Sequence, residues 1–179
     1  MDVDHTEPMF GVASDKSTDD WYTPSWLFDI MDVRFDLDVA APPGGVDWIP
    51  ADRYYTAADD GLAQPWKGFV WCNPPYSAPY QWALKWAAHG DGLILLRADM
   101  STGGPFAAFA AASSLFVPKG RLRFVNGFGG STSSTTFSTV LLGVGKTADA
   151  AIARLGLLTD GVSRKLGVQP HRMVFSDER

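Results

Sequence analysis

The sequence is poor in residues that bind metals and form disulfide bridges. It contains one cysteine, Cys72, and three scattered histidines, His5, His89 and His171, among 179 residues. A single cysteine excludes an intramolecular disulfide framework and a thiolate metal cluster, and it is typical of proteins from a reducing cytoplasm. We therefore expect no metal site and a cytoplasmic location.

Long hydrophobic runs are also missing. Segments such as GLILLRADM (92–100) are interrupted within about ten residues, whereas a helix needs about 20 to cross a bilayer. The N-terminus is acidic rather than cationic and apolar, unlike an export signal. With 46% hydrophobic and 20% charged residues, the composition is that of a globular protein with no membrane partner. The length fits one domain better than two.

Charge is distributed unevenly along the chain. The net charge is −5, but residues 1–62 carry −11 and residues 63–179 carry +6. The acidic early half suits a cationic small ligand, whereas the basic later half, from Lys119, Arg121 and Arg123 onward, suits a polyanionic partner. The alternative interpretation is a solvated acidic face that binds no ligand.

Hydrophobic periodicity predicts strands that alternate with helices. Strands are expected at 35–40, 69–73, 92–98, 115–125 and 136–145, and helices at 24–31, 78–89, 104–114 and 147–158. Loops are expected at 52–68, with one helical turn, and at 126–135. This alternation indicates an α/β fold with a central, mostly parallel sheet flanked by helices. Residues 1–18 are expected to form a flexible N-terminal arm, and residues 19–179 a single domain.

The segment NPPY, from Asn73 to Tyr76, ends the strand expected at 69–73. Ligands of open α/β sheets bind beyond the carboxyl ends of the strands, so this segment is a candidate site. Pro74 and Pro75 fix their φ angles and lack N–H donors, which leaves rigid carbonyl acceptors beside the Asn73 amide oxygen. The Tyr76 ring can stack on a planar group. The alternative is a plain strand terminator, since Asn-Pro and Pro-Pro are common in loops.

Acceptors beside an aromatic ring suit a planar group that bears an NH₂. In adenine the amine lone pair is delocalised into the ring, and acceptors that bind the two amine hydrogens localise it on nitrogen for attack on a methyl sulfonium. Because this attraction grows as the nitrogen becomes cationic, the acceptors stabilise the transition state and not only the bound substrate. The proton can leave to water afterward, so no strong base is needed.

Six segments, in this order, resemble the DNA N6-adenine methyltransferases, and most closely their small phage-type family. They are DDWYTPSWLFD, LDVAA, DDGLAQPWKG, VWCNPPYS, GRLRF and FSTVLLG, and the similarity covers roughly residues 19–145. The resemblance implies a Rossmann-like methyltransferase fold, S-adenosylmethionine as cofactor and double-stranded DNA as partner. It also implies the host cytoplasm as location if a phage encodes the protein, with protection from restriction as a fitting role.

The resemblance further implies roles for individual residues. NPPY is similar to the catalytic motif, in which Asn73 and the Pro74 carbonyl bind the target amine, with Pro75 beside them, and Tyr76 stacks on the flipped base. The cofactor's methionine end is expected at WYTP, its amino group near Asp38, and its adenine at Asp60. The implied cofactor residues are Trp21, Tyr22, Thr23, Pro24, Asp38, Ala40, Asp60 and Gly61.

Two features depart from the family pattern. Pro42 and Pro43 follow the first acidic strand where many methyltransferases have glycines, and the glycines are delayed to 44–45. No insertion is large enough for a separate target-recognition domain. Sequence specificity then has to come from loops such as RADMSTGG and VNGFGGSTSSTT, from a protein partner or from a dimer.

The acceptor remains open at this point, because the same tetrapeptide also serves enzymes that methylate RNA or glutamine side chains. A DNA-binding relative that has lost catalysis is a third alternative. Lys119, Arg121 and Arg123 in KGRLRF are the candidates for DNA-backbone contacts, and a solvated strand edge is the competing interpretation.

Several other residues favour structural roles. Trp82 and Trp86 are four residues apart on one helix face, which is typical of core positions. Cys72 is expected to be buried in its strand and not to act as a nucleophile, and His89 is expected at a helix end. The GKT at 145–147 lacks the upstream glycine of a phosphate-binding loop.

Overall fold

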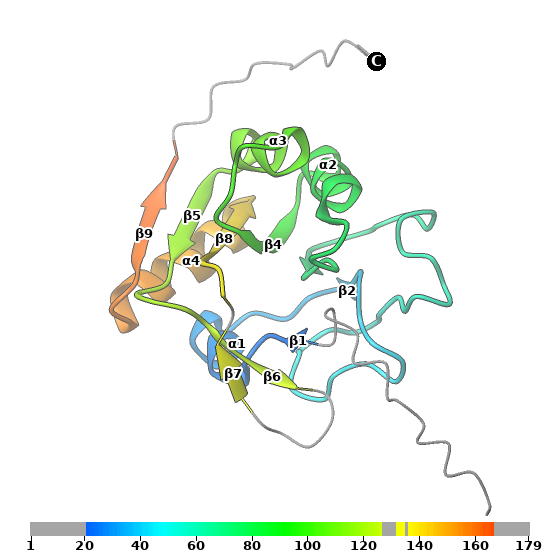
Figure 1. Ribbon diagram of the computed structural model, residues 1–179, viewed down its shortest axis with the longest axis horizontal. Helices are drawn as coiled ribbons and strands as arrows, with labels where there is room; N and C mark the ends of the chain where they lie inside the picture. The colour runs from blue at the N-terminus through cyan, green and yellow to red at the C-terminus, as the bar shows by residue number, and fades with distance from the viewer. Residues whose placement is uncertain (1–20, 127–131, 135, 167–179) are drawn as a thin grey trace, which may run out of the picture.

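The protein is described here by a computed structural model that covers residues 21–126, 132–134 and 136–166 (Figure 1). Residues 1–18, expected to form an arm, lie outside the described residues. In chain order the elements are β1 (Trp21–Tyr22), α1 (Ser25–Met31), β2 (Leu37–Asp38), β3 (Val70–Cys72), α2 (Pro79–His89), β4 (Gly92–Arg97), α3 (Gly103–Ala111), β5 (Ser114–Val117), β6 (Arg123–Asn126), β7 (Thr132–Ser134), β8 (Thr139–Val144), α4 (Lys146–Leu158) and β9 (Val162–Lys165).

A six-stranded sheet forms the centre of the molecule, with strand order β2-β3-β4-β8-β5-β9. β2 pairs with β3 and β3 with β4 in parallel, whereas β8 is antiparallel to both β4 and β5, and β9 is antiparallel to β5. The strands β2, β3, β4 and β5 therefore share one direction, and β8 and β9 run the opposite way. The α/β class is confirmed.

Most neighbouring strands of the main sheet pair antiparallel, so the expectation of a mostly parallel sheet is wrong. Only two of the five neighbouring pairs are parallel. The reason is the placement of β8, which inserts between β4 and β5 and separates two strands that share a direction. β8 is apolar after its first residue, Thr139, and is buried over nearly its whole length, as is typical of a central strand, and this pattern does not reveal strand direction.

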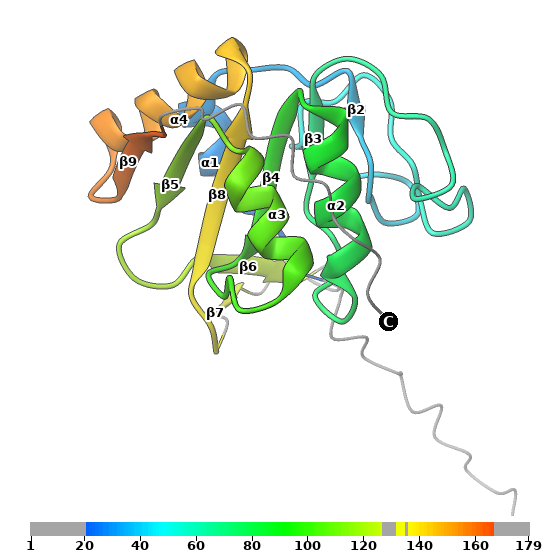
Figure 2. The same ribbon diagram turned by 90° about the horizontal axis from the view of Figure 1, so that it is seen from above.

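Each face of the central sheet is covered by its own pair of helices (Figures 1 and 2). Successive strand residues point to opposite faces. Trp71 and Leu93 pack in a cluster with residues of α1 and α4, while Cys72 and Ile94 pack with Trp86 of α2 on the other face. The prediction that Cys72 is a buried strand residue is confirmed, because its side chain is fully buried.

A second, smaller sheet has the strand order β1-β6-β7, and all its pairs are antiparallel. It lies at the end of the main sheet toward which β5 points (Figure 1). Trp21 of β1 lies opposite Asn126 of β6. This sheet brings the WYTP segment to the carboxyl-terminal end of the main sheet.

The sequence interpretation differs from the structure in the second half of the chain. The single strand expected at 115–125 is two strands in different sheets, β5 and β6, because Pro118 lacks an N–H and Gly120 has a φ of +78° that turns the chain. β7 lies within a segment expected to be a loop, and the short strands β1 and β9 were not expected. Among the described residues, no helix is long and apolar enough to cross a membrane.

Candidate active site

A cavity of about 390 Å³ lies where β2 and β3 end. Its walls come from β1, from the chain after β2, from the loop around residue 60, from NPPY and from the first turn of α2. The lining residues are Trp21, Tyr22, Ala40, Ala41, Pro42, Pro43, Thr56, Ala57, Asp60, Gly61, Asn73, Pro75 and Trp82. The volume falls in the range of roughly 300–1,000 Å³ that small-molecule sites occupy. The carboxyl end of a strand in an α/β sheet is where ligands are expected.

Asn73 follows β3 directly and is held by the small sheet. Its Nδ2 donates a hydrogen bond of 3.2 Å to the Trp21 carbonyl oxygen. Because a carbonyl can only accept, this contact fixes which end of the amide is the nitrogen. The Asn73 Oδ1 is buried and has no hydrogen-bond partner in the described part of the chain. An unpaired buried acceptor costs about 1–3 kcal/mol, and on a residue that lines a cavity it is a candidate to bind a ligand.

Tyr76, the last residue of NPPY, does not line the cavity. It is 8% exposed and packs edge-on against Phe124 and Phe137, with ring centroids 6.0 and 5.0 Å away. The Arg97 guanidinium lies 5.6 Å from the Tyr76 ring. Burial raises the pKa of Tyr76 above its ordinary value. A base stacked on Tyr76 has to replace one of these neighbours, so the stacking role stays a prediction.

Replacing Tyr76 with phenylalanine should leave the protein at least as stable as the wild type. The Tyr76 hydroxyl is buried without a partner among the described residues, so its removal relieves a cost of about 1 kcal/mol or more. Urea unfolding measures the change. Tyr76→Ala should instead destabilise by about 3–5 kcal/mol, because it removes a packed ring. A Tyr76→Phe variant clearly less stable than the wild type would mean that the hydroxyl has a native partner.

The WYTP segment is divided between the cavity and the core. Trp21 and Tyr22 line the cavity, whereas Thr23 and Pro24 are buried and do not line it. The Thr23 carbonyl accepts a hydrogen bond of 2.8 Å from Trp48 Nε1, which anchors the start of α1 to the loop after β2.

The loop of residues 60–64, called the acidic loop below, presents Asp60 and Gly61 to the cavity. Asp60 has a left-handed backbone with a φ of +53°. Asp59 caps this turn by accepting hydrogen bonds from the Thr56 N–H and hydroxyl, which lower the pKa of Asp59. A Cβ at Gly61 would overlap the Val39 carbonyl oxygen and press on the Trp82 ring. The loop is therefore closely packed where it meets the cavity wall.

Asp38 is buried and does not line this cavity. It lines a separate cavity of about 190 Å³ together with Gly44 and Gly45, and its Oδ1 accepts a 3.1 Å hydrogen bond from the Ala40 N–H. Burial raises the pKa of Asp38 from 3.8 to about 7, against a smaller lowering by the Ala40 hydrogen bond. The delayed glycines thus shape the surroundings of Asp38, while Pro42 and Pro43 line the main cavity.

The model of one protein family, DNA N-6-adenine-methyltransferase (Dam), matches residues 12–163 of this sequence. The chain belongs to this family. A curated relative, the DNA N-6-adenine-methyltransferase of Haemophilus phage HP1 (strain HP1c1), is 29% identical over 124 residues, which cover 63% of this chain and 69% of the relative. No solved structure matches the chain. The resemblance to phage-type adenine methyltransferases is confirmed, and each predicted site residue lies within the region that the Dam family matches.

The sequence analysis missed one wall of this Dam-family cavity. Trp82 was expected in the core together with Trp86, and only Trp86 is fully buried. Trp82 lines the cavity and stacks on Trp66, with centroids 6.1 Å apart and planes 27° from parallel. The position of Trp82 in the helix could have indicated this role. Because α2 begins at Pro79, Trp82 lies in its first turn, beside the strand ends, whereas Trp86 lies one turn farther along.

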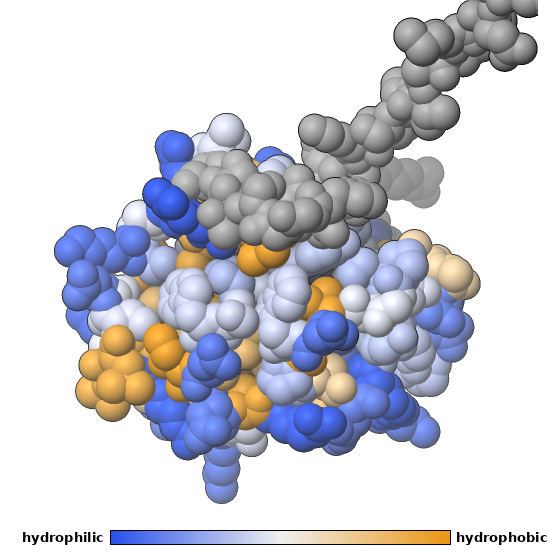
Figure 3. Space-filling view, turned by 90° about the horizontal axis from the view of Figure 1, so that it is seen from below, coloured by the Kyte–Doolittle hydropathy of each residue, from blue (hydrophilic) through white to orange (hydrophobic). Residues whose placement is uncertain are grey.

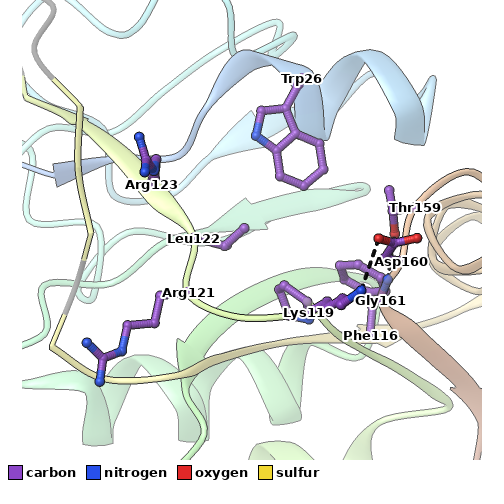
Figure 4. Close-up of a pocket in the computed structure, with 10 residues that line it drawn as sticks. Trp26, Phe116, Lys119, Arg121, Leu122, Arg123, Thr159, Asp160 and Gly161 are labelled. Atoms are coloured by element: carbon purple, nitrogen blue, oxygen red, sulfur yellow. Dashed lines mark hydrogen bonds and ion pairs between the residues drawn. The ribbon is translucent and has the colours of Figure 1, made fainter.

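The three candidate DNA-binding residues lie away from the Dam-family cavity. Lys119, Arg121 and Arg123 line a different hollow of about 330 Å³, beneath the half-exposed ring of Trp26 (Figure 4). Lys119 pairs with Asp160 at 3.3 Å, and both side chains are exposed. Figure 4 shows the Arg121 side chain directed away from Trp26. The structure brings these cations together on one surface, and their role in DNA binding stays a prediction.

Proposed function

We propose that this Dam-family protein transfers a methyl group from S-adenosylmethionine to the N6 amine of adenine in double-stranded DNA. The observation that carries the proposal is the Asn73 oxygen, an unpaired acceptor on a residue that lines the cavity at the end of β3. The four strands of common direction support a Rossmann-like methyltransferase fold, and the site's position at their carboxyl ends agrees with it.

The cavity fits S-adenosylmethionine in size and chemistry. Its volume of about 390 Å³ suits a ligand of this class. Aromatic and aliphatic walls from Trp21, Tyr22, Ala40 and Trp82 suit the cofactor's adenine and ribose, and Asp60 offers a carboxylate to its polar groups. When bound, S-adenosylmethionine supplies an electrophilic methyl group on a cationic sulfur. The acidic first half of the chain, which carries −11 over residues 1–62, favours this positive charge.

Asn73 would act on the target amine as a hydrogen-bond acceptor. Its Nδ2 is already bound to the Trp21 carbonyl, so the oxygen is oriented before substrate arrives. The acceptor attracts the amine hydrogens more strongly as the nitrogen gains positive charge, which lowers the barrier and not only the dissociation constant. The amine nitrogen then releases its proton to water.

The target adenine has to leave the duplex to reach this cavity. Base flipping costs a few kcal/mol, which stacking on an aromatic ring partly offsets. Tyr76 was predicted for this role, and Trp82 is a second ring on the cavity wall. We further propose that residues 19–179 form one methyltransferase domain without a separate target-recognition domain, and that it acts in the cytoplasm.

Target recognition could then be shared with a second copy or a protein partner. Leu157, Leu158 and Val162 are exposed where α4 leads into β9, the edge strand of the main sheet. Figure 3 shows the apolar surface of one face as small patches among polar residues. An exposed apolar group beside an edge strand supports the proposal of such an interface.

A direct comparison of acceptors tests the proposed reaction. The purified protein and tritiated S-adenosylmethionine are incubated with unmethylated plasmid DNA, with RNA or with protein, and the labelled products are digested. The proposal predicts label in N6-methyldeoxyadenosine from DNA. Label in RNA adenine or in glutamine would reassign the acceptor, and no label in any substrate would favour a DNA-binding relative without catalysis.

Replacing Arg121 and Arg123 together with alanine should weaken DNA binding and its salt dependence. If each side chain neutralises one phosphate, the slope of log K against log salt becomes shallower by about 1.8, at roughly 0.9 per contact. Fluorescence anisotropy between about 50 and 200 mM salt measures it. Arg53→Ala, which removes an exposed arginine from the acidic half, is the control. A slope equal to that of the wild type would remove both arginines from the contact surface.

A further inference from the structure

The ammonium group of Lys85 forms hydrogen bonds with three carbonyl groups of the acidic loop. Lys85 projects from α2, and its Nζ donates hydrogen bonds to the carbonyl oxygens of Gly61 at 3.2 Å, of Leu62 at 2.6 Å and of Gln64. An ammonium has three donors, so all of them can be used by this one loop. Lys85 does not line the cavity, so it has no direct contact with a ligand bound there.

A tryptophan reinforces this attachment. The Lys85 Nζ lies 4.9 Å from the centre of the Trp66 ring, at a distance where a cation is attracted to the ring face. Trp66 Nε1 donates a 2.8 Å hydrogen bond to the same Gly61 carbonyl that Lys85 binds. Trp66 also stacks on Trp82, which lines the cavity. Two donors thus converge on Gly61, a residue of the cavity wall.

Backbone hydrogen bonds also shape this loop. Within it, the Ala63 and Gln64 N–H groups donate to the Asp60 carbonyl at 2.8 and 3.1 Å. Desolvation at this position lowers the pKa of Lys85, and the nearby Asp60 carboxylate opposes that effect. Removing the ammonium would take this donor from three carbonyls, and the turn that presents Asp60 and Gly61 would lose its Lys85 hydrogen bonds to α2.

We propose that Lys85 is a positioning residue that holds the 60–64 loop in its ligand-binding conformation and thereby sets the affinity for the cofactor. The inference rests on the proposed function, because it takes the cavity as the S-adenosylmethionine site. It assigns Lys85 no contact with the reacting atoms. Its loss should therefore change binding of the cofactor and leave the chemical step intact once the cofactor is saturating.

Lys85→Met tests the proposal, because methionine keeps an unbranched apolar chain and removes the donors. The dissociation constant and KM for S-adenosylmethionine should rise about tenfold or more, as expected for lost charge-assisted hydrogen bonds, and kcat at saturating cofactor should stay within about twofold of the wild type. Lys67→Met is the matched control, since Lys67 is exposed, lies three residues after the 60–64 loop and carries the same charge. It should bind the cofactor as the wild type does.

Two further measurements separate positioning from general stability. Hydrogen exchange should be faster in Lys85→Met at the Ala63 and Gln64 amides, and unchanged in β4. In Lys85→Ala, ethylammonium should restore cofactor affinity, whereas tetramethylammonium at the same ionic strength, which has no N–H donor, should not.

The outcomes distinguish this inference from the proposed function. A wild-type protein that does not bind S-adenosylmethionine would overturn both. Binding by the wild type with equal affinity in Lys85→Met would overturn the role of Lys85 alone. A loss of kcat without a change in KM would place Lys85 in the chemical step, and global unfolding of both Lys85 variants without rescue by ethylammonium would make it a residue of general stability. Either outcome would also overturn the inference.

Discussion

Asn73→Ala should lower the methylation rate by about 100- to 1,000-fold at saturating DNA and cofactor, the usual effect of removing one group that stabilises developing charge. The Asn73 oxygen has no partner among the described residues, and the proposed mechanism gives it one only when the target amine is present. Its effect should appear in kcat, because the interaction strengthens as the amine becomes cationic. Cofactor affinity should change little.

Tritium transfer from S-adenosylmethionine measures the rate, and equilibrium dialysis measures cofactor binding. Asn73→Asp keeps an acceptor oxygen but loses the donor that binds the Trp21 carbonyl, so it should retain more activity than Asn73→Ala. Gln81→Ala removes an exposed amide from α2 and serves as the control. An Asn73→Ala variant as active as the wild type would remove Asn73 from the catalytic machinery.

Asp38→Asn should stabilise the protein by up to about 4 kcal/mol above pH 7, and by much less near pH 4. Burial raises the pKa of Asp38 from 3.8 to about 7. Between these pH values the folded protein keeps a proton that the unfolded chain has lost, so the contribution of Asp38 to the free energy of unfolding falls as pH rises through this window. Each pKa unit corresponds to about 1.4 kcal/mol. Asparagine is neutral at every pH and avoids this loss.

Urea unfolding of both proteins at several values between about pH 4 and 8 measures the difference, which should grow with pH. Asp29→Asn, which removes an exposed carboxylate from α1, controls for net charge. If Asp38 faces the cofactor's amino group, as the resemblance implies, the same variant should bind S-adenosylmethionine more weakly at pH 8 although it is more stable. A pH-independent difference in stability would show that Asp38 is not protonated in the folded protein near neutral pH.

The sequence predicted those strands and helices that depend on short, local sequence patterns. β3 and α2 follow from an apolar run, a pair of prolines and helical spacing, and the position of Cys72 follows from the same run. The cavity at the end of β3 was expected because NPPY interrupts a strand of an α/β fold. Trp21, Asp60 and Asn73, expected near one another from motif order, all line this cavity.

The parts that sequence reasoning missed depend on contacts between distant segments. β8 lies between β4 and β5, and local sequence patterns do not predict with which strands a buried strand pairs. Asp38 lines a second cavity and not the one at the end of β3, which the sequence could not show, and its role toward the cofactor stays a prediction. In the sequence, Lys85 is an ordinary polar residue of an amphipathic helix. Its proposed role in positioning the loop follows only from the loop carbonyls that it binds.

The central claim is that an acceptor on Asn73 directs a methyl group to adenine N6 in DNA, and a genome-wide map of N6-methyladenine tests it most directly. The wild-type protein and Asn73→Ala are expressed at equal levels in cells that lack adenine methylation of their own. The account predicts methylated adenines at a recurrent short sequence with the wild type and a far smaller methylated fraction at the same sites with Asn73→Ala. Equal methylation by both proteins, or none by the wild type, would contradict it.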